Sequence, residues 1–325
     1  MKQDNKEYAE KNLFNGLNGQ SLISPLESQS NLVEPKIRLG ILASGKGSNF
    51  EYIIKSIQKK QLNAEISILI VNNPNCLAVK KAIKSSDVVI YSIGLVREFP
   101  HRGITFQETQ FEGVKQTVDL AKEFNIKRYI LVSANGARLD GTKYQSTKYL
   151  AEEYLKHSGL DWTIFRPSLC FGDPRGDGRP EFCTQLKKDM LSLPIPSPSF
   201  HNGLIPINAG KFALSPIHIK NVAEFVVKSI DMDAAKNKTY KLGGEAYHWK
   251  DLVPIMAAAY GKKKWMIPAP AIAVKAMAFF LQRFAWFPIT VDQLTMLLES
   301  NVCDSKEHFE LYYVGEESAS SAEHK

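Results

Sequence analysis

The feature that most constrains the fold is a regular alternation of short apolar runs with amphipathic segments between residues 37 and 165. The apolar runs have the length of strands, and the segments between them repeat apolar residues at helical spacing. Strands that alternate with amphipathic helices build a parallel sheet, because each helix carries the chain back across one face. The sequence therefore predicts an α/β protein with a doubly wound parallel sheet. The expected strands are 37–43, 66–71, 87–93, 129–132 and 162–165, and the expected helices are 50–57, 114–124 and 143–157.

The texture of the chain changes after residue 168, where prolines and glycines cluster at 172–180 and 194–206. Such loops are typical of a region that surrounds a ligand. We therefore expect a smaller C-terminal substrate lobe, built from about residues 168–215 and 240–310. Residues 1–35 are polar without a period and are expected to form a flexible leader. Later helices are expected at 221–230, 249–260 and 291–298.

The charge pattern and the cysteine spacing exclude several classes of function. The chain has 325 residues and a net charge of +7, but its lysines are scattered and the tightest cluster is Lys262–Lys264. We therefore expect no nucleic-acid binding. The four cysteines lie far apart and form no ligand-type spacing, so we expect no metal site. Reduced cysteines and a polar N-terminus favour a cytoplasmic protein.

Residues 267–289 form a strongly apolar and aromatic stretch. Three prolines and the charged Lys275 and Arg283 interrupt it, so a membrane-spanning helix is not expected. The preferred interpretation is a buried or lobe-facing helix. The alternative is a helix that contacts a protein complex or a membrane surface, with the protein peripheral at the inner face of that membrane.

Tyr144 and Lys148 are the candidate catalytic pair. Their spacing of four residues places both side chains on one face of the helix expected at 143–157. An ammonium group beside a phenol favours the phenolate, so Lys148 is expected to lower the pKa of Tyr144. Such a tyrosine can exchange a proton with a substrate hydroxyl or carbonyl. Taken alone, the spacing also fits an exposed pair that arises by chance in a helix.

Other motifs surround this pair in a characteristic order. They are Arg128–Ser133, Trp162–Ser168, Phe171–Gly172, Ser215–Ala223 and Tyr240–Gly244, with 87–113 and 290–302 on either side. Over residues 77–305 this order resembles the extended and atypical short-chain dehydrogenase/reductase superfamily. Within it, the chain is most similar to the branch of the nucleotide-binding accessory subunit of respiratory complex I.

The resemblance implies a Rossmann-like sheet that binds NADP or NAD together with a small-molecule substrate whose identity is unknown. It implies that Tyr144 is the acid/base, that Lys148 holds the nicotinamide ribose, and that Ser133 is a candidate catalytic hydroxyl. The remaining cofactor contacts that it implies are Ser92, Gly94 and Pro167.

Two positions depart from the family pattern. Ala134 occupies the expected slot of the catalytic Ser or Thr, which leaves Ser133 one residue early and on the opposite side of a strand. Gln110 stands where an asparagine often precedes the fourth helix. Both departures favour a protein that holds a dinucleotide and turns over slowly or not at all.

The N-terminal segment 36–80 differs from the body at 81–325. Its loop contains Gly45, Gly47, Ser48 and Asn49, and lacks the third glycine of a dinucleotide-binding loop. Residues 37–76 resemble the opening of glycinamide ribonucleotide formyltransferase, whose corresponding loop binds phosphate at a helix N-terminus. The later catalytic motif of that enzyme is missing, so no formyl transfer is expected. The chain is interpreted as a formyltransferase-like head joined near Cys76–Ala82 to a dehydrogenase-like body.

Asn72 and Asn73 follow the second expected strand, where NAD-binding proteins usually place an acidic residue. This favours weak dinucleotide binding with a slight preference for NADP over NAD. The two asparagines also fit a simple turn before Pro74. Three interpretations follow: an NAD(P)-dependent oxidoreductase or epimerase, a dinucleotide-binding accessory or assembly factor of a respiratory complex, and a non-functional hybrid.

Overall fold

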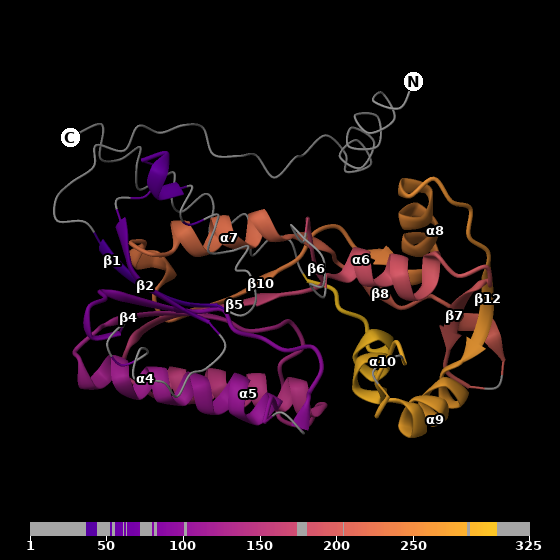
Figure 1. Cartoon of the computed structure of the whole chain (residues 1–325), viewed down its shortest axis with the longest axis horizontal. Coiled ribbons are helices and arrows are strands. Elements are labelled where there is room, and N and C mark those ends of the chain that lie inside the picture. The colour runs from indigo at the N-terminus through magenta and orange to yellow at the C-terminus, as the bar shows by residue number, and fades with distance from the viewer. Residues whose placement is uncertain are drawn as a thin grey trace.

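A six-stranded parallel sheet forms the centre of the protein, in the order β10-β5-β4-β3-β1-β2 (Figure 1). All five pairings between neighbouring strands are parallel, so the predicted doubly wound α/β fold is confirmed. The strands are β1 (Ile37–Ala43), β2 (Ala64–Val71), β3 (Val88–Tyr91), β4 (Arg128–Val132), β5 (Asp161–Pro167) and β10 (Lys238–Leu242). The computed structural model describes residues 37–43, 53, 56–60, 62, 64–71, 80, 83–100, 103–173, 181–203, 205–284 and 287–303.

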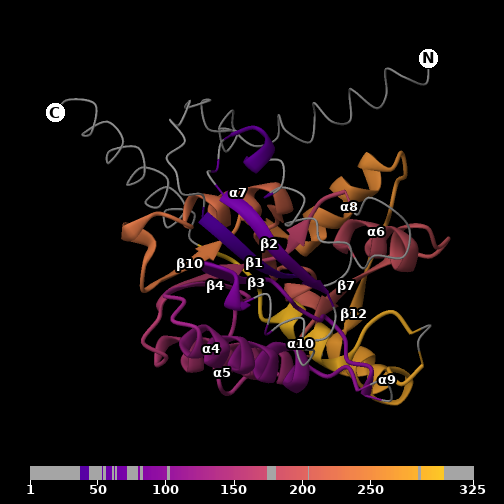
Figure 2. The same ribbon diagram turned by 60° about the vertical axis from the view of Figure 1, so that its left-hand side comes forward.

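Helices cover both faces of this sheet (Figures 1 and 2). Side chains alternate across a strand, so Val88 and Ile90 pack on one face while Val89 and Tyr91 pack on the other. The first face is covered by α7 (Ile219–Lys228), and the second by α4 (Gly113–Glu123) and α5 (Lys143–Lys156). Two separate apolar clusters therefore pack against the two faces of the sheet and fix the positions of its strand ends.

Helix α5 begins at a capping box. The Thr142 hydroxyl accepts from the backbone N–H of Gln145, and the Gln145 side chain accepts from the backbone N–H of Thr142. Such a box satisfies donors that the first helical turn would otherwise leave unpaired. The start of α5, and with it the position of Tyr144, is thus set by local sequence.

The helix expected at 114–124 extends further than the sequence predicted. A π-helical turn, η2 (Gln107–Glu112), leads directly into α4. Gln110 lies in this turn and is buried.

The β2 edge of the sheet is the second point at which the described structure bears on the sequence. No strand is described between β2 and β3, so β2 is the edge strand among the residues that the structure describes.

A smaller lobe packs beside the carboxyl end of the sheet and contains most of the chain after residue 181 except α7 and β10 (Figure 1). Its strand β12 (Met266–Pro270) pairs in parallel with β7 (Ser197–His201). The lobe helices are α6 (Phe182–Leu186), the π-helical η3 (Lys187–Leu191), α8 (Trp249–Ala259), α9 (Ala271–Leu281) and α10 (Val291–Leu298). The remaining short elements are β6 (Cys170–Phe171), η4 (Pro206–Asn208), β8 (Ala213–Leu214), β9 (Ile217–His218), η5 (Asp233–Ala235) and β11 (Tyr247–His248).

Polar contacts hold this lobe against the sheet. Arg97, in the loop after β3, donates to the backbone carbonyls of Gln282, Phe284 and Phe287 at distances of 2.6, 3.2 and 3.2 Å. Glu299, just after α10, accepts from Arg138 at 2.6 Å and from Gln145 at 2.9 Å. Charge-assisted bonds of this kind are directional, so they fix the angle between lobe and sheet.

The apolar stretch 267–289 was expected to form a buried or lobe-facing helix, and it contains one lobe-packed helix rather than a helix along its whole length. It divides into β12 and α9, because Pro268 and Pro270 favour an extended backbone before the helix begins. On α9, Ile272, Phe279 and Phe280 are 79%, 67% and 65% exposed. Among the described residues, no helix is long and apolar enough to cross a membrane.

Candidate functional site

A cavity of about 1020 Å³ lies between the carboxyl ends of β3, β4 and β5 and the C-terminal lobe. This is the edge at which open parallel sheets bind ligands. Seven residues that the sequence analysis discussed as site positions lie in the wall of this cavity. They are Ser92, Gly94, Ser133, Ala134, Tyr144, Lys148 and Pro167.

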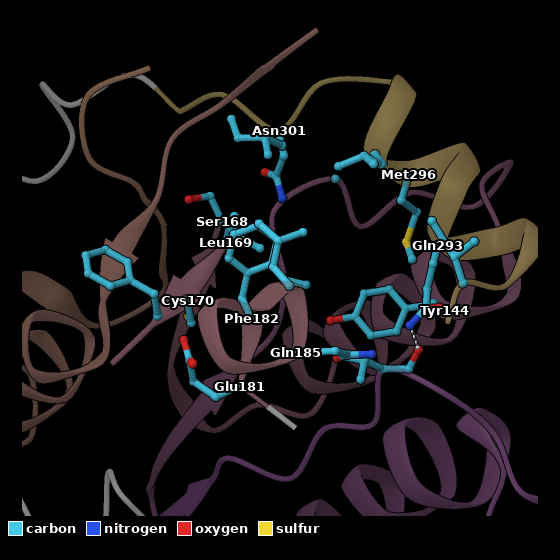
Figure 3. Close-up of a pocket in the computed structure, with 18 of the residues that line it drawn as sticks. Tyr144, Ser168, Leu169, Cys170, Glu181, Phe182, Gln185, Gln293, Met296 and Asn301 are labelled. Carbon is cyan, nitrogen blue, oxygen red and sulfur yellow. Dashed lines mark hydrogen bonds between the residues drawn. The ribbon is translucent and has the colours of Figure 1, made fainter. Parts of the chain in front are cut away.

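Tyr144 is the second residue of α5, and its ring extends into this cavity between side chains of α6 and α10 (Figure 3). The ring packs edge-on against Phe106, with 5.6 Å between centroids. No hydrogen bond to its hydroxyl is found among the described residues. The hydroxyl is therefore available to a ligand.

The pKa of Tyr144 is raised, whereas the sequence predicted that Lys148 would lower it. Burial raises the pKa of this phenol well above its ordinary value, and Cys170 adds to the effect. The expected lowering by Lys148 does not occur, because the ammonium group is turned towards backbone carbonyls. Tyr144 therefore keeps its proton at neutral pH and is present in the form that can donate it.

Lys148 lies one helical turn further along α5 and is buried. Its Nζ donates to the carbonyl of Ile93 at 3.4 Å and to that of Val132 at 3.3 Å. Burial lowers its pKa to about 8, although the charge of Glu152 opposes this. An ammonium group has three hydrogens, so one remains for a ligand beside the strand ends.

The space next to Lys148 fits a cofactor that passes between strand β3 and α5. A Cβ placed on Gly94 would lie 3.6 Å from Lys148 Nζ, so a larger side chain here would extend into this space. Lys148 and the backbone of 92–94 are thus suited to hold the ribose of a dinucleotide, which is hydroxyl-rich and needs donors and close backbone approach.

Ser133 lies in the cavity wall, but its hydroxyl bonds to another side chain, and its assignment as a catalytic hydroxyl stays a prediction. Its Oγ donates to Glu152 Oε1 at 2.5 Å. Glu152 is fully buried and also accepts from Arg166 Nε at 2.9 and 3.0 Å. The reason is the two-residue period of a strand, which turns Ser133 towards α5. Ala134 follows it and offers no hydroxyl.

Gln110 has a positioning role. Its amide Nε2 donates to the carbonyl of Leu95 at 2.9 Å, and its Oε1 accepts from Thr147 Oγ1 at 3.0 Å. It thereby ties the loop after β3 to α5, beside Lys148. The glycine loop with Gly45, Gly47, Ser48 and Asn49, and the pair Asn72 and Asn73, lie outside the described residues.

The sequence missed most of the residues on the lobe side of the cavity. They come from seven elements and the loops between them, which are distant along the chain, so no local motif unites them. The apolar members are Phe182, Leu186, Met190, Leu193, Ile195, Phe200, Trp249, Ile267, Val274, Met277, Phe287, Ile289, Met296 and Leu297. Their signal in the sequence is a set of apolar residues among prolines, and that signal does not distinguish a core from a pocket.

A family model described as NAD(P)H-binding matches residues 42–189. This range includes the cavity residues at the carboxyl ends of β3, β4 and β5, from Ser92 to Pro167. It also extends across the predicted joint at Cys76–Ala82. No curated protein matches the sequence.

Solved structures share the fold at low sequence identity. A nucleoside-diphosphate-sugar epimerase from Staphylococcus aureus superposes with a TM-score of 0.60 and 17% identity, covering 84% of this chain and 95% of that one. MoeE5 in complex with UDP-glucuronic acid and NAD gives 0.54 and 14%, covering 82% and 95%. The dTDP-4-dehydrorhamnose reductase of Bacillus anthracis, in complex with NADP, gives 0.54 and 12%, covering 74% and 86%.

Together these comparisons give the chain an NAD(P)-binding, Rossmann-like domain with the epimerase-type fold. The expected cofactor class is thereby confirmed. These comparisons do not extend to the complex I accessory branch or to a formyltransferase head, which were both inferred from sequence resemblance.

Proposed function

We propose, from the premise that residues 42–189 form an NAD(P)-binding Rossmann-like domain, that this protein is an NAD(P)H-dependent reductase of a carbonyl compound. The supporting observation is that the Tyr144 side chain lines the cavity one helical turn from the buried Lys148. Tyr144 is the proton donor in this proposal, and Lys148 holds the nicotinamide ribose. Ser92, Gly94 and Pro167 form the wall against which the cofactor lies.

The residues of the chain have distinct tasks in such a reaction. The nicotinamide ring, when bound, supplies the hydride that the carbonyl carbon receives. Tyr144 Oη donates its proton to the carbonyl oxygen, which becomes the alcohol of the product. The resulting phenolate takes a proton back from solvent. Because burial raises its pKa, Tyr144 carries its proton before the reaction, and the negative charge that develops on the substrate oxygen draws this proton across.

Replacing Tyr144 with phenylalanine tests the proposal. Purified protein is assayed for NADPH oxidation with a panel of ketones and aldehydes, and NADPH affinity is measured by calorimetry. Tyr144→Phe should lower turnover by about 10²- to 10⁴-fold, the usual contribution of general acid catalysis, while NADPH affinity changes little. Tyr154→Phe is the matched control, because the Tyr154 hydroxyl lies on the same helix but bonds to Asp119. Unchanged turnover in Tyr144→Phe would overturn the assignment.

A second candidate function is that of a dinucleotide-holding accessory or assembly factor of a respiratory complex. The observation that favours it is that the Ser133 hydroxyl bonds to Glu152 and that position 134, the expected slot of the catalytic Ser or Thr, is an alanine. An accessory role predicts NADPH binding without turnover of any carbonyl compound. An epimerase would instead keep its cofactor bound through the reaction and show no net NADPH oxidation.

The N-terminal loop is proposed to bind the pyrophosphate of the cofactor through Gly45, Gly47, Ser48 and Asn49. A glycine loop before a helix offers unpaired backbone N–H groups to an anion. No formyl transfer is proposed for this head.

The slight preference for NADP is proposed from Asn72, and calorimetry on Asn72→Asp with both cofactors tests it. Wild-type protein that binds NAD more than about tenfold better than NADP, the discrimination that a ribose-binding carboxylate would supply, contradicts this proposal.

The exposed face of α9 is proposed to contact an anionic membrane surface. Ile272, Phe279 and Phe280 project from one side of the helix, since they are spaced at about two turns. Arg283 continues this face and Lys275 lies beside it. Apolar side chains beside cations are the pattern of interfacial helices on anionic lipid.

Sedimentation with vesicles tests this contact. Wild-type protein should sediment with phosphatidylglycerol vesicles and remain free with phosphatidylcholine vesicles. Phe279→Ser with Phe280→Ser should abolish sedimentation, whereas Leu139→Ser, at a residue that is 63% exposed elsewhere, should not. Equal sedimentation of all three proteins would contradict the proposal.

A further inference from the structure

The cavity has two chemically different ends. Near the sheet, it is lined by backbone groups and by Lys148 and Tyr144. Towards the lobe, its wall is formed by aromatic and aliphatic side chains from α6, η3, β7, α8, β12, α9 and α10. Trp249 and Phe200 pack together there, with 6.3 Å between ring centroids. A ligand that reaches beyond Tyr144 therefore meets apolar surface.

The charges at the wall argue against an anionic substrate. Its described carboxylates are Asp173, Glu181, Asp189 and Glu299, and its described cations are Arg138 and Lys148. Both cations are engaged. Arg138 Nη2 lies 2.6 Å from Glu299 Oε1, and Lys148 bonds to two backbone carbonyls at the cofactor end.

A diphosphate group carries two negative charges and requires cations or unpaired N–H groups to leave water. Within the described wall, the lobe end supplies more carboxylates than cations. A diphosphate would therefore find no cation without a partner in the described wall, although MoeE5, which shares this fold, is solved in complex with UDP-glucuronic acid and NAD. The epimerase-type fold and the chemistry of the cavity thus point to different substrates.

We infer that the substrate of this site is an uncharged, largely apolar carbonyl compound rather than a nucleotide sugar. This inference rests on the proposed reductase function and specifies its substrate class. The apolar part lies among Phe182, Met190, Trp249 and Met296, and the carbonyl oxygen lies at Tyr144 Oη. Methionines suit this task, because their flexible side chains adapt to different apolar shapes.

Competitive binding to the full-length protein tests the inference without requiring turnover. The neutral dye Nile red is the probe, and its displacement is measured with a series of 2-alkanones from 2-pentanone to 2-undecanone. Each added methylene should tighten binding by about three- to fourfold, which corresponds to roughly 0.8 kcal/mol per buried CH₂. UDP-glucose and UDP should not displace the dye.

Two lysine variants locate the dye. Met296→Lys places a cation in the cavity and should weaken 2-undecanone binding by about tenfold or more, since an unpaired charge is costly in apolar surroundings. Ile272→Lys is the matched control, because Ile272 is 79% exposed on α9 and should not affect binding. A larger effect in Ile272→Lys, affinity that is independent of chain length, or displacement by UDP-glucose would each overturn the inference.

The outcome is separable from that of the proposed reductase activity. Chain-length-dependent binding with no NADPH oxidation would support the apolar site and contradict the reductase. NADPH oxidation that depends on Tyr144, together with competition by UDP-glucose, would support the reductase and contradict the apolar substrate.

Discussion

The two sides of the cavity differ in the arrangement of their polar and apolar side chains. On the sheet side, buried polar groups are paired with one another, as in the contacts of Glu152 with Ser133 and Arg166. On the lobe side, apolar side chains face the cavity, and others on α9 face outward. The sheet side holds the candidate proton donor in one position, whereas the lobe side offers adaptable apolar surface.

The difference separates two properties of the protein. A fully paired polar network in a packed core rigidifies the groups that it contains. Tyr144 and Lys148 stand on α5, which this network fixes to β4 and β5 through Glu152. The lobe can vary its apolar residues without moving the proton donor. The sheet side therefore determines the position of the proton donor, and the lobe side determines the size of substrate that fits.

The largest effect is expected from breaking the network on the sheet side. Arg166→Met should destabilise the fold by about 3–5 kcal/mol, because the fully buried Glu152 loses the partner of its charge. Arg138→Met is the control. Arg138 and Glu299 are 42% and 29% exposed, so this pair should contribute no more than about 1 kcal/mol. Urea denaturation measures both. Equal losses would remove the contrast between the two sides.

Lys148→Met should stabilise the folded chain at pH 7 by roughly 3 kcal/mol while weakening NADPH binding. Below pH 8, Lys148 is charged in both the folded and the unfolded chain, and burial opposes folding in full. Between about pH 8 and its ordinary pKa of 10.5, the unfolded chain binds this proton more than the folded chain, so wild-type stability should rise.

Urea denaturation of both proteins from pH 7 to pH 10.5 checks this expectation. The advantage of Lys148→Met should shrink as the pH rises through that window. A variant that is less stable than the wild type at pH 7 would show that Lys148 contributes to folding as well as to the site.

Arg97→Met should lower the free energy of local unfolding of the lobe by about 1–3 kcal/mol, without a comparable effect on the sheet. The guanidinium of Arg97 donates to three carbonyls at the end of α9 and in the segment after it, and these would lose their donor. Hydrogen exchange should become faster in α9 and α10, while the amides of β3 and β4 stay protected. Faster exchange throughout the chain would mean that lobe and sheet unfold as one unit.

The smallest effect on stability is expected on the outer face of α9. Phe280→Ser should change the free energy of unfolding by no more than about 0.5 kcal/mol, since Phe280 is 65% exposed and exposed positions tolerate substitution. Thermal denaturation of the isolated protein measures it. A loss of several kcal/mol would indicate that this face is covered in solution, which would sharpen the contrast with the sheet.

Much of the fold could be predicted from sequence, because its signals are local. The strand at 37–43 and the helix at 291–298 have the predicted bounds, and the start of α5 follows from its capping residues. Strand β10 was not predicted, since Lys238–Leu242 is polar at an edge of the sheet and lacks a buried run. The π-helical turn before α4 has no local signature and was also missed.

The sequence by itself placed Tyr144 and Lys148 on one helix face, because four residues make about one turn. It also predicted that Ala134 occupies the slot of the catalytic Ser or Thr, with Ser133 one residue early. Only the tertiary structure decided the protonation state of Tyr144, since burial depends on residues such as Phe106 that are distant along the chain. It also decided that apolar residues from seven elements form one cavity, because local periodicity shows that a side chain is apolar but not what it faces.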